Sequence, residues 1–443
     1  MKNKLTSFFV LFLGILASSM IFFNVENFNI FAAEKDFVKK QEVLVKYRNN
    51  DKIETINVPG GIYIEQFILD LEKNSNIEFA EPNYSYKAVI IPSDTYYGNQ
   101  WYLQKIKAPE AWNTTRESGD KIIAIIDSGV QINHPDLKEN IWINNKEIPG
   151  NNIDDDDNGF IDDINGWDFV SNTPDPNPKF EEGYTSAGIL HGTIVAGVAA
   201  ASGNNASGVS GVTWRARIMP LRVLDGKGEG DTNNVVKAVD YAVTNGADII
   251  NFSFVGFGNS RALERAIRRA YTAGVIVVAA AGNEQDDGDG YSLDETPMYP
   301  ACHDGNLGEN MVIGVAATDA LDQKASFSSY GFKCVDVSAP GVSIFSTSVY
   351  NPEKSNIEYG YNKYYDGYWS GTSMATPMVS AVASLVSATA PGFNRNEIIA
   401  AIVDNSDNIN RLNQDFLGQL GMGRLNVNSS VIYVRNSLYA KSA

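Results

Sequence analysis

The chain has 443 residues, of which 44% are hydrophobic and 20% charged, so its length allows several domains or one large domain with attachments. Its net charge of -18 and isoelectric point near 4.6 argue against nucleic acids and anionic membrane surfaces as partners, because both repel an acidic protein. Two cysteines, Cys302 and Cys334, are too few for a disulfide framework and lack metal-ligand spacing. From the residues alone, they form one bridge or stay as free thiols.

The N-terminus predicts a secretory signal peptide. Lys2 and Lys4 precede an apolar run over residues 5–23, and a small residue suited to cleavage follows at Ala33. This layout favours removal of residues 1–33 and export of the remainder to the extracellular space or a periplasm. The apolar run is also long enough for an uncleaved membrane anchor, which stays open as an alternative. No later segment is apolar enough to span a bilayer, so no membrane contact is expected after removal of the signal.

Residues 34–92 predict a small folded unit followed by a linker. The pattern favours a strand at 43–47, an amphipathic helix at 62–73 and a strand at 77–80, which together make an α+β module. A module this short buries only a marginal core, so we expect it to lean on a partner surface. The proline and tyrosine residues that follow are typical of an exposed and cleavable linker.

Residues 93–443 are predicted to form one α/β domain. The expected strands cover residues 121–127, 217–224, 247–254, 275–283 and 311–318. The expected helices cover residues 191–201, 232–245, 260–273, 374–390 and 395–405. The apolar character of the strands indicates a mostly parallel central sheet with both faces covered by helices. Because ligands bind at the carboxyl ends of such strands, functional residues are expected there.

Four polar residues stand where this sheet can present them. Asp127 ends the first strand and Asn283 the fourth. His191 opens a helix of small residues, and Ser373 sits between a glycine turn and a buried helix. A histidine held by an aspartate can take the proton of a serine nucleophile, and an asparagine can donate to the oxyanion that forms. Each residue taken alone also fits a turn or a helix cap. The other two histidines lie in irregular segments, which favours His191 as the general base.

An aspartate-rich loop predicts a cation site. Its candidate ligands alternate around a glycine turn and are Asp154, Asp156, Asn158, Phe160, Asp162 and Asp163. This spacing is close to that of calcium-binding loops, although Asn165 stands where an EF-hand has its glutamate. Calcium is favoured over a solvated acidic loop, because so dense a group of carboxylates repels itself without a cation. Asp286, Asp287 and Asp289 form a weaker second candidate.

The segments around these residues resemble the subtilisin-like serine proteases, the subtilase or peptidase S8 family. The resemblance rests on Ile-Ile-Asp-Ser-Gly around Asp127, His-Gly-Thr from His191 and Gly-Thr-Ser-Met-Ala-Thr-Pro around Ser373, and it extends over about residues 101–426. It implies a subtilisin-like fold in which His191 takes the Ser373 proton and Asp127 orients His191. Asn283 and the Ser373 N–H are then expected to bind the oxyanion.

The same resemblance implies a role for residues 34–92. The stretches that begin at Val43 and Ile77 look like a subtilase propeptide, an α+β module of ferredoxin-like architecture that assists folding and inhibits the active site. Self-cleavage is expected between about Tyr84 and Asp94. The mature protein is expected to be a monomer that acts on polypeptide substrates.

Two cleft edges are also implied by the resemblance. Substrate is expected to bind as an added strand between two segments, whose residues are Gly228, Glu229, Gly230, Ser253, Phe254, Val255 and Gly256. Val255 stands where the family more often has glycine, which predicts a narrowed first pocket. Glu229 and Asp231 predict a preference for basic residues just upstream of the cut. Ile194 replaces the usual histidine of the second signature, which is expected to alter packing more than catalysis.

The predicted function is that of a secreted, calcium-stabilised serine endopeptidase, which works through an acyl-enzyme and matures from a zymogen. The resemblance places Cys302 and Cys334 near each other behind the first pocket, where an exported protein can hold a disulfide.

Two alternatives to the predicted function stay open. One is a maturation protease dedicated to a single exported precursor or leader peptide. The other is a non-catalytic subtilase with a binding role, which the intact set of four site residues argues against.

Overall fold

The computed structural model describes residues 38–48, 50–84, 90–284, 288–304, 308–355 and 359–442. The predicted signal peptide and the predicted ligands Asp286 and Asp287 lie outside these ranges. Within them, no helix combines the length and the apolar character needed to cross a bilayer. The chain divides into two compact units, residues 1–88 and 89–443.

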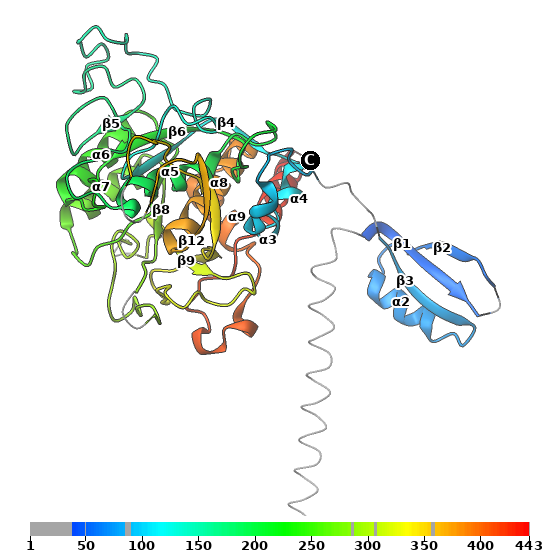
Figure 1. The fold of residues 1–443 in the computed structure, drawn as a ribbon. Helices are drawn as coiled ribbons and strands as arrows, with labels where there is room; N and C mark the ends of the chain where they lie inside the picture. Colours follow the sequence, from blue (N-terminus) through cyan, green and yellow to red (C-terminus); the bar gives the residue numbers. More distant parts are fainter. Residues whose placement is uncertain are drawn as a thin grey trace, which may run out of the picture. The chain divides into compact units, whose positions relative to one another are not determined.

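The N-terminal unit is a small α+β module. It contains β1 (Val38–Tyr47), β2 (Ile53–Asn57), α2 (Ile64–Glu72) and β3 (Ile77–Tyr84), with the strands antiparallel in the order β2-β1-β3 (Figure 1). Val43 and Val45 of β1 are fully buried, and α2 contributes partly buried side chains to the same cluster. The predicted α+β character is therefore confirmed. Strand β2 was not predicted, because it is mostly exposed and lacks the alternation that marks a half-buried strand.

The second unit is built on a parallel sheet of seven strands. The strands are β4 (Glu117–Asp127), β5 (Trp167–Asp168), β6 (Arg215–Arg222), β7 (Ile249–Phe252), β8 (Ile276–Ala280), β9 (Val312–Thr318) and β10 (Val337–Pro340). Their order is β10-β9-β8-β7-β4-β6-β5, and every neighbouring pair is parallel. A separate antiparallel pair is formed by β11 (Ile344–Thr347) and β12 (Tyr365–Trp369). The prediction of a mostly parallel central sheet is confirmed.

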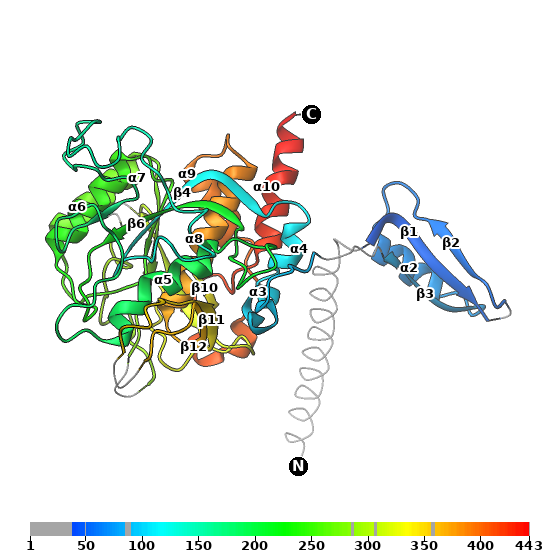
Figure 2. The same cartoon turned by 45° about the horizontal axis from the view of Figure 1, so that its top comes forward.

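Helices cover both faces of this sheet. They are α3 (Trp101–Lys105), α4 (Ala108–Trp112), α5 (Ser186–Ala200), α6 (Thr232–Thr244), α7 (Arg261–Thr272), α8 (Thr372–Thr389), α9 (Arg395–Val403) and α10 (Val427–Ser442). Short 3-10 turns occur at Tyr97–Asn99, Asn410–Leu412 and Gln414–Phe416. Helices α6 and α7 lie together on one side, while α5, α8, α9 and α10 belong to the other (Figures 1 and 2).

Strand β4 shows why the sequence folds into these layers. Ile123 and Ile125 are buried in the cluster that contains α5 and α8, whereas Ala124 and Ile126 are buried in the cluster that contains α6 and α7. Alternate side chains of a strand point to opposite faces, so a strand covered on both sides has to be apolar at every position. The first polar residue after this run, Asp127, is thereby delivered to the carboxyl edge of the sheet.

The prediction that His191 opens its helix is wrong. Helix α5 begins at Ser186, because the Thr185 hydroxyl accepts a hydrogen bond from the Gly188 N–H at 3.0 Å and caps the first turn. His191 is the sixth residue of α5. Its position relative to Asp127 therefore depends on how the body of the helix packs on the sheet.

Cys302 and Cys334 form a disulfide. It belongs to a small apolar cluster that includes Met298 and is contacted by Val255, so it lies behind the pocket to which Val255 contributes.

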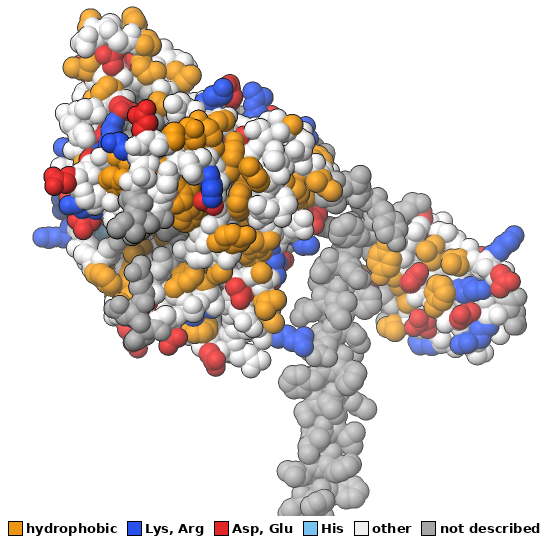
Figure 3. Space-filling model, viewed as in Figure 1, with side chains coloured by type: hydrophobic (Ala, Val, Ile, Leu, Met, Phe, Trp, Pro, Cys, Tyr) orange, Lys and Arg blue, Asp and Glu red, His pale blue; other side chains and the backbone are white. Residues whose placement is uncertain are grey.

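The surface shown in Figure 3 carries scattered acidic and basic side chains around a central group of hydrophobic ones. The excess of negative charge is therefore not gathered into one patch on this face.

Candidate active site

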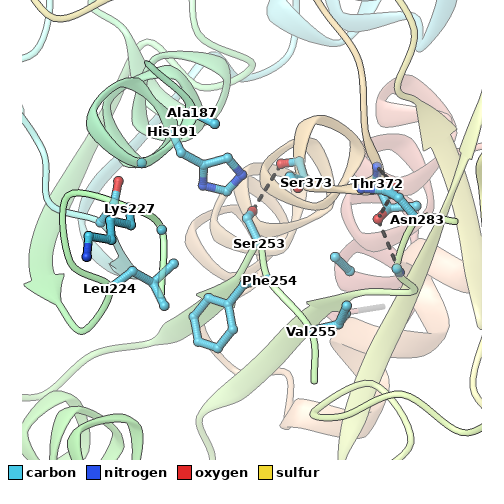
Figure 4. Close-up of a pocket in the computed structure, with 15 residues that line it drawn as sticks. Ala187, His191, Leu224, Lys227, Ser253, Phe254, Val255, Asn283, Thr372 and Ser373 are labelled. Atoms are coloured by element: carbon cyan, nitrogen blue, oxygen red, sulfur yellow. Dashed lines mark hydrogen bonds between the residues drawn. The ribbon is translucent and has the colours of Figure 1, made fainter. Parts of the chain in front are cut away.

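Three of the residues predicted to carry out the chemistry line one pocket at the carboxyl edge of the sheet. Its volume is about 320 Å³. It is lined by Ser128, Ala187, Gly188, His191, Leu224, Lys227, Gly228, Ser253, Phe254, Val255, Ala280, Gly282, Asn283, Thr372 and Ser373. Figure 4 shows His191, Ser253, Ser373 and Asn283 in sequence along this pocket, although they come from different elements. The structure thus brings three of the four predicted site residues to the pocket wall, and the fourth, Asp127, lies directly behind His191.

The side chains of Asp127 and His191 form a close pair. The Nδ1–H of His191 donates to Oδ1 of Asp127 at 2.7 Å, and Asp127 is fully buried. The backbone N–H of Ser128 donates to the same oxygen at 2.7 Å, which fixes the carboxylate. Because Nδ1 of His191 is occupied by this bond, Nε2 is the ring nitrogen left for proton transfer.

A glycine allows helix α5 to approach the end of β4 closely enough for this pair to form. A Cβ atom added to Gly192 would lie 2.3 Å from the carbonyl oxygen of Gly129 and 3.2 Å from Cβ of Asp127. Any larger residue would push the helix away from the strand. The Gly192 N–H also donates to the Ser128 hydroxyl at 3.2 Å, which ties the two elements together.

The electrostatic setting separates His191 from the other histidines. Burial lowers the pKa of His191, but the charge and the hydrogen bond of Asp127 outweigh this effect and raise the pKa above the usual 6.5. Burial lowers the pKa of both His134 and His303 to about 4. His134 is held by the Tyr364 carbonyl at 2.8 Å from Nε2, as expected for a structural residue. His191 is the histidine suited to accept and release a proton near neutral pH.

Ser373 is positioned by the start of α8 and by a buried polar network. It is the second residue of α8, so its N–H belongs to the first turn, where no intrahelical acceptor exists. Its carbonyl oxygen accepts from the Ser253 hydroxyl at 3.0 Å. The Ser253 hydroxyl in turn accepts from Nδ2 of Asn251 at 2.9 Å. Ser253 was predicted as part of a cleft edge, but this link from β7 to α8 was not predicted, because Asn251 belongs to no motif that the sequence analysis recognised.

Asn283 is held in one orientation by Thr372. Its Oδ1 accepts from the backbone N–H of Thr372 at 2.9 Å and from the Thr372 hydroxyl at 3.0 Å. An N–H cannot accept, so the atom facing Thr372 has to be the oxygen, and Nδ2 lies on the opposite side. A Cβ atom added to Gly371 would lie 3.3 Å from Nδ2 of Asn283 and 3.5 Å from Oγ of Ser373. The absence of a side chain at Gly371 leaves a space between the donor and the nucleophile.

The predicted cleft edges are only partly in the pocket wall. Gly228, Ser253, Phe254 and Val255 line it, whereas Glu229, Gly230 and Gly256 do not. Gly230 pairs with Leu224 in an isolated bridge, and Gly256 pairs with Tyr299. Glu229 is exposed. Asp231 accepts from the Asn234 N–H and caps α6.

Lys227 was not considered in the sequence analysis. Among the described residues that line the pocket, Lys227 and His191 are the two with a side chain that can change its charge by titration.

The acidic loop gathers a smaller group of carboxylates than predicted. Oxygens of Glu147, Asp154 and Asp156 lie within 4.8 Å of one another. Oδ1 of Asp156 is buried and has no hydrogen-bond partner among the described residues. An unpartnered buried carboxylate oxygen inside a group of three carboxylates fits a hard divalent cation such as calcium.

The other predicted ligands are engaged differently. Asp162 accepts from the backbone N–H groups of residues 150, 151 and 152. Asp163 accepts from Asn144, Asn158 and Tyr241. The Phe160 side chain packs against Trp167, Phe169 and Tyr241 and anchors the loop to the sheet.

Glu147 is the member of this group that sequence reasoning missed. Its Oε1 accepts from the N–H groups of Asp155 and Asp156, and its Oε2 accepts from that of Asp162. It lies seven residues before Asp154, outside the alternating pattern. Its participation depends on the folded shape of the loop, and no local signal indicates it.

Comparison with known proteins places this geometry in context. The profile of the Subtilase family, Peptidase_S8, matches residues 119–423. A thermophilic serine proteinase of Bacillus sp. (strain AK1) is 35% identical over 404 residues, which cover 91% of this chain and 84% of the relative. Thermitase of Thermoactinomyces vulgaris is 37% identical over 319 residues, which cover 72% of this chain and 92% of the relative.

A more distant relative and a solved structure agree with these matches. The halolysin-like extracellular serine protease Nep of Natrialba magadii is 32% identical over 367 residues, which cover 83% of this chain and 58% of the relative. A solved structure described as a protease from Pseudoalteromonas arctica superposes with a TM-score of 0.60 at 25% identity. That match covers 77% of this chain and 99% of the solved one.

Proposed function

This chain belongs to the subtilase family and is a serine endopeptidase, and we propose that it cuts peptide bonds through Asp127, His191 and Ser373 after export and self-processing. The observation that carries the catalytic proposal is the 2.7 Å bond from His191 Nδ1 to the buried Asp127, in a pocket that Ser373 and Asn283 also line. These residues come from separate elements: Asp127 ends β4, His191 lies in the body of α5, and Ser373 is in the first turn of α8.

In the proposed first step, Oγ of Ser373 attacks the carbonyl carbon of the scissile peptide bond. The hydroxyl proton passes to Nε2 of His191 as the Oγ–C bond forms. Asp127 holds the imidazole in the tautomer with hydrogen on Nδ1 and stabilises the imidazolium that results. The tetrahedral intermediate then expels the amine, which takes the proton from His191, and an ester to Ser373 remains.

The oxyanion of the tetrahedral intermediate is proposed to lie in the space left by Gly371. Nδ2 of Asn283 and the backbone N–H of Ser373 border this space and can both donate to it. In the second step, His191 deprotonates a water molecule, which attacks the ester carbonyl carbon. The same donors hold the second oxyanion, and release of the acid regenerates the Ser373 hydroxyl.

The proposal includes a zymogen. Residues 38–84 form an α+β unit of their own, which is expected of a propeptide that occupies the active site until it is cut. The proposed cut lies between Tyr84 and Asp94. Asp94 is buried and accepts from the Ser210 hydroxyl at 2.8 Å and the Asn204 N–H at 2.7 Å, so the chain beyond the cut stays fastened to the catalytic unit.

Export and calcium complete the proposal. A relative is named as an extracellular serine protease, and the predicted signal peptide agrees with the same destination. Glu147, Asp154 and Asp156 are the residues proposed to hold calcium, with Asp156 Oδ1 as the unpartnered ligand. A bound calcium ion would neutralise their mutual repulsion and stabilise the loop, and it has no part in the chemical steps.

The test compares wild type with Ser373→Ala, using intact-mass analysis, casein hydrolysis and labelling by a fluorophosphonate. Wild type should lose its N-terminal segments, hydrolyse casein and carry one label on Ser373. Ser373→Ala should keep the propeptide and be inactive. Ser437→Ala, on α10 and outside the pocket wall, is the matched control and should behave like wild type. Full processing and unchanged casein hydrolysis in Ser373→Ala would refute the assignment of the nucleophile.

A further inference from the structure

The ammonium group of Lys324 lies among four backbone carbonyl oxygens. Its Nζ donates to the carbonyls of Asp289 at 2.7 Å, Ser326 at 2.9 Å, Ser328 at 3.0 Å and Ala325 at 3.1 Å. These carbonyls come from two segments that are separated by more than thirty residues of chain. An ammonium has three N–H groups, so four acceptors exceed what one lysine needs. The arrangement is that of a small carbonyl cage around a single positive charge.

The surroundings of this cage favour a cation. Nζ lies 4.8 Å from the ring centroid of Phe416 and 5.4 Å from that of Tyr330, so two aromatic rings add to the attraction. Burial lowers the pKa of Lys324 to about 8, an effect opposed by the negative charges of Asp289 and Glu284. The side chain is therefore still charged at neutral pH. Rings of carbonyl oxygens are also what proteins use to bind dehydrated monovalent cations.

We propose that the carbonyls of residues 289, 325, 326 and 328 form a monovalent-cation site that the Lys324 ammonium occupies, and that Lys324 is thereby a positioning residue for Asn283. The first half of this proposal concerns the cage alone. The second half rests on the proposed function, because it assigns a catalytic consequence to the cage through the oxyanion donor.

The connection from the cage to Asn283 is a short backbone pairing. The segment that carries three of the four carbonyls lies alongside the end of β8: the Ser329 N–H donates to the Gly282 carbonyl at 3.0 Å, and the Glu284 N–H donates to the Phe327 carbonyl at 2.9 Å. Asn283 itself pairs with Ser328. The position of Asn283 is therefore set by a segment whose own carbonyls converge on Lys324.

Removal of the ammonium would leave the carbonyls of residues 289, 326 and 328 without this donor, while the Ala325 carbonyl would keep the Ser328 N–H at 2.9 Å. The three carbonyls would separate or turn toward water, and the paired residues 282–284 would move with them. A displacement of about 1 Å at a catalytic group can cost about 10²-fold in rate. Because substrate is bound by other parts of the pocket, the loss is expected in kcat, with little change in KM.

The experiment compares Lys324→Ala with Lys324→Met by kinetics on a peptide p-nitroanilide, using enzyme counted by fluorophosphonate titration. Lys324→Ala removes three carbons and the ammonium group, which together correspond to propylammonium. Added propylammonium or potassium can therefore enter the emptied cage. Lys324→Met keeps the side-chain length but not the charge, and its thioether fills the space. Both variants should lose about 10²-fold in kcat. Propylammonium or potassium should restore Lys324→Ala by about tenfold or more and leave Lys324→Met unchanged.

Lys121→Ala is the matched control. Lys121 is a partly buried lysine bound to Asp248 at 2.7 Å and lies outside the pocket wall, so its loss should leave kcat near wild type and create no response to propylammonium. An unchanged kcat in Lys324→Ala would overturn the positioning role. Equal restoration of Lys324→Ala and Lys324→Met would also overturn it, because the effect would then not depend on an open cage.

A second measurement tests the cage without any catalysis. The full chain carrying Ser373→Ala is compared with the same chain carrying Lys324→Ala as well, by thermal unfolding in sodium, potassium and propylammonium chloride. Potassium or propylammonium should raise the Tm of the double variant relative to sodium and leave the parent unchanged. Identical Tm values in the three salts would refute the cation site. This result does not depend on peptidase activity, so it is distinct from a failure of the proposed function.

Discussion

Oδ1 of Asn283 accepts two hydrogen bonds from Thr372, one from its backbone N–H at 2.9 Å and one from its hydroxyl at 3.0 Å. Thr372 directly precedes the nucleophile on α8, and Asn283 follows β8. The pair therefore couples the orientation of the oxyanion donor to the helix that carries Ser373. Any displacement of one element is transmitted to the other through these two bonds.

Replacement of Asn283 by alanine is expected to lower kcat by about 10² to 10³-fold, because one donor to the oxyanion is lost. KM should change little, since the bond is made in the transition state. Thr372→Val keeps the backbone N–H and the shape of the side chain but loses two hydrogen bonds of the hydroxyl, one to Asn283 Oδ1 and one from the Gly282 N–H. Because the backbone bond to Asn283 remains, a smaller loss of about tenfold is expected. Steady-state kinetics on a peptide p-nitroanilide measure both losses, with Asn245→Ala, at the residue that follows α6, as a control. A Thr372→Val loss larger than that of Asn283→Ala would contradict this order.

Gly371→Ala is expected to obstruct the oxyanion space directly. The new Cβ would lie 3.3 Å from Nδ2 of Asn283 and 3.5 Å from Oγ of Ser373, where the substrate oxygen has to enter. We expect kcat/KM to fall by about 10²-fold or more. Labelling by a fluorophosphonate should slow in parallel, because the phosphonyl oxygen uses the same space. Wild-type labelling rates together with lost peptidase activity would show that the space serves another purpose.

The catalytic residues differ in how far they were predictable. Asp127 could be placed because an apolar strand buried on both faces has to end at the working edge of the sheet, and the first polar residue marks that edge. Ser373 was placed by its glycine turn and buried helix. The start of α5 was misplaced, because the cap at Thr185 is followed by small and apolar residues that carry no clear boundary signal.

The parts that were missed depend on contacts between distant segments. Asn251, Thr372 and Glu147 act through hydrogen bonds that exist only after the sheet and loops have assembled. Strands as short as β5, with two residues, have no readable periodicity. The predicted rim charge at Glu229 shows the same limit, since a position beside a cleft in sequence does not determine whether a side chain reaches the pocket.

The acid limb of the pH profile reports the pKa of His191. His191 has to be neutral to accept the Ser373 proton, and Asp127 raises its pKa above 6.5. Activity is therefore expected to be full well above this pKa and to fall as the pH drops through it, so the midpoint of the limb in kcat/KM should lie above pH 6.5. In Asp127→Asn the raising charge is lost while burial persists. The residual activity, about 10⁴-fold lower, should then have its midpoint below pH 6.5. Coincident midpoints would exclude Asp127 as the cause.

Calcium removal is expected to destabilise the fold through the loop that carries Asp154 and Asp156. A site filled at about 100 times its Kd adds about 2.7 kcal/mol to the free energy of unfolding, which corresponds to about 5 °C in Tm for a domain of this size. A chelator should lower the Tm of the Ser373→Ala chain by about 5 °C. Glu147→Gln removes one charge from the group of three carboxylates and should shrink the response. Asp157→Asn is the matched control, because Asp157 is exposed in the same loop and its positive φ suits asparagine. Equal chelator responses in Glu147→Gln and the parent would place the stabilising calcium elsewhere.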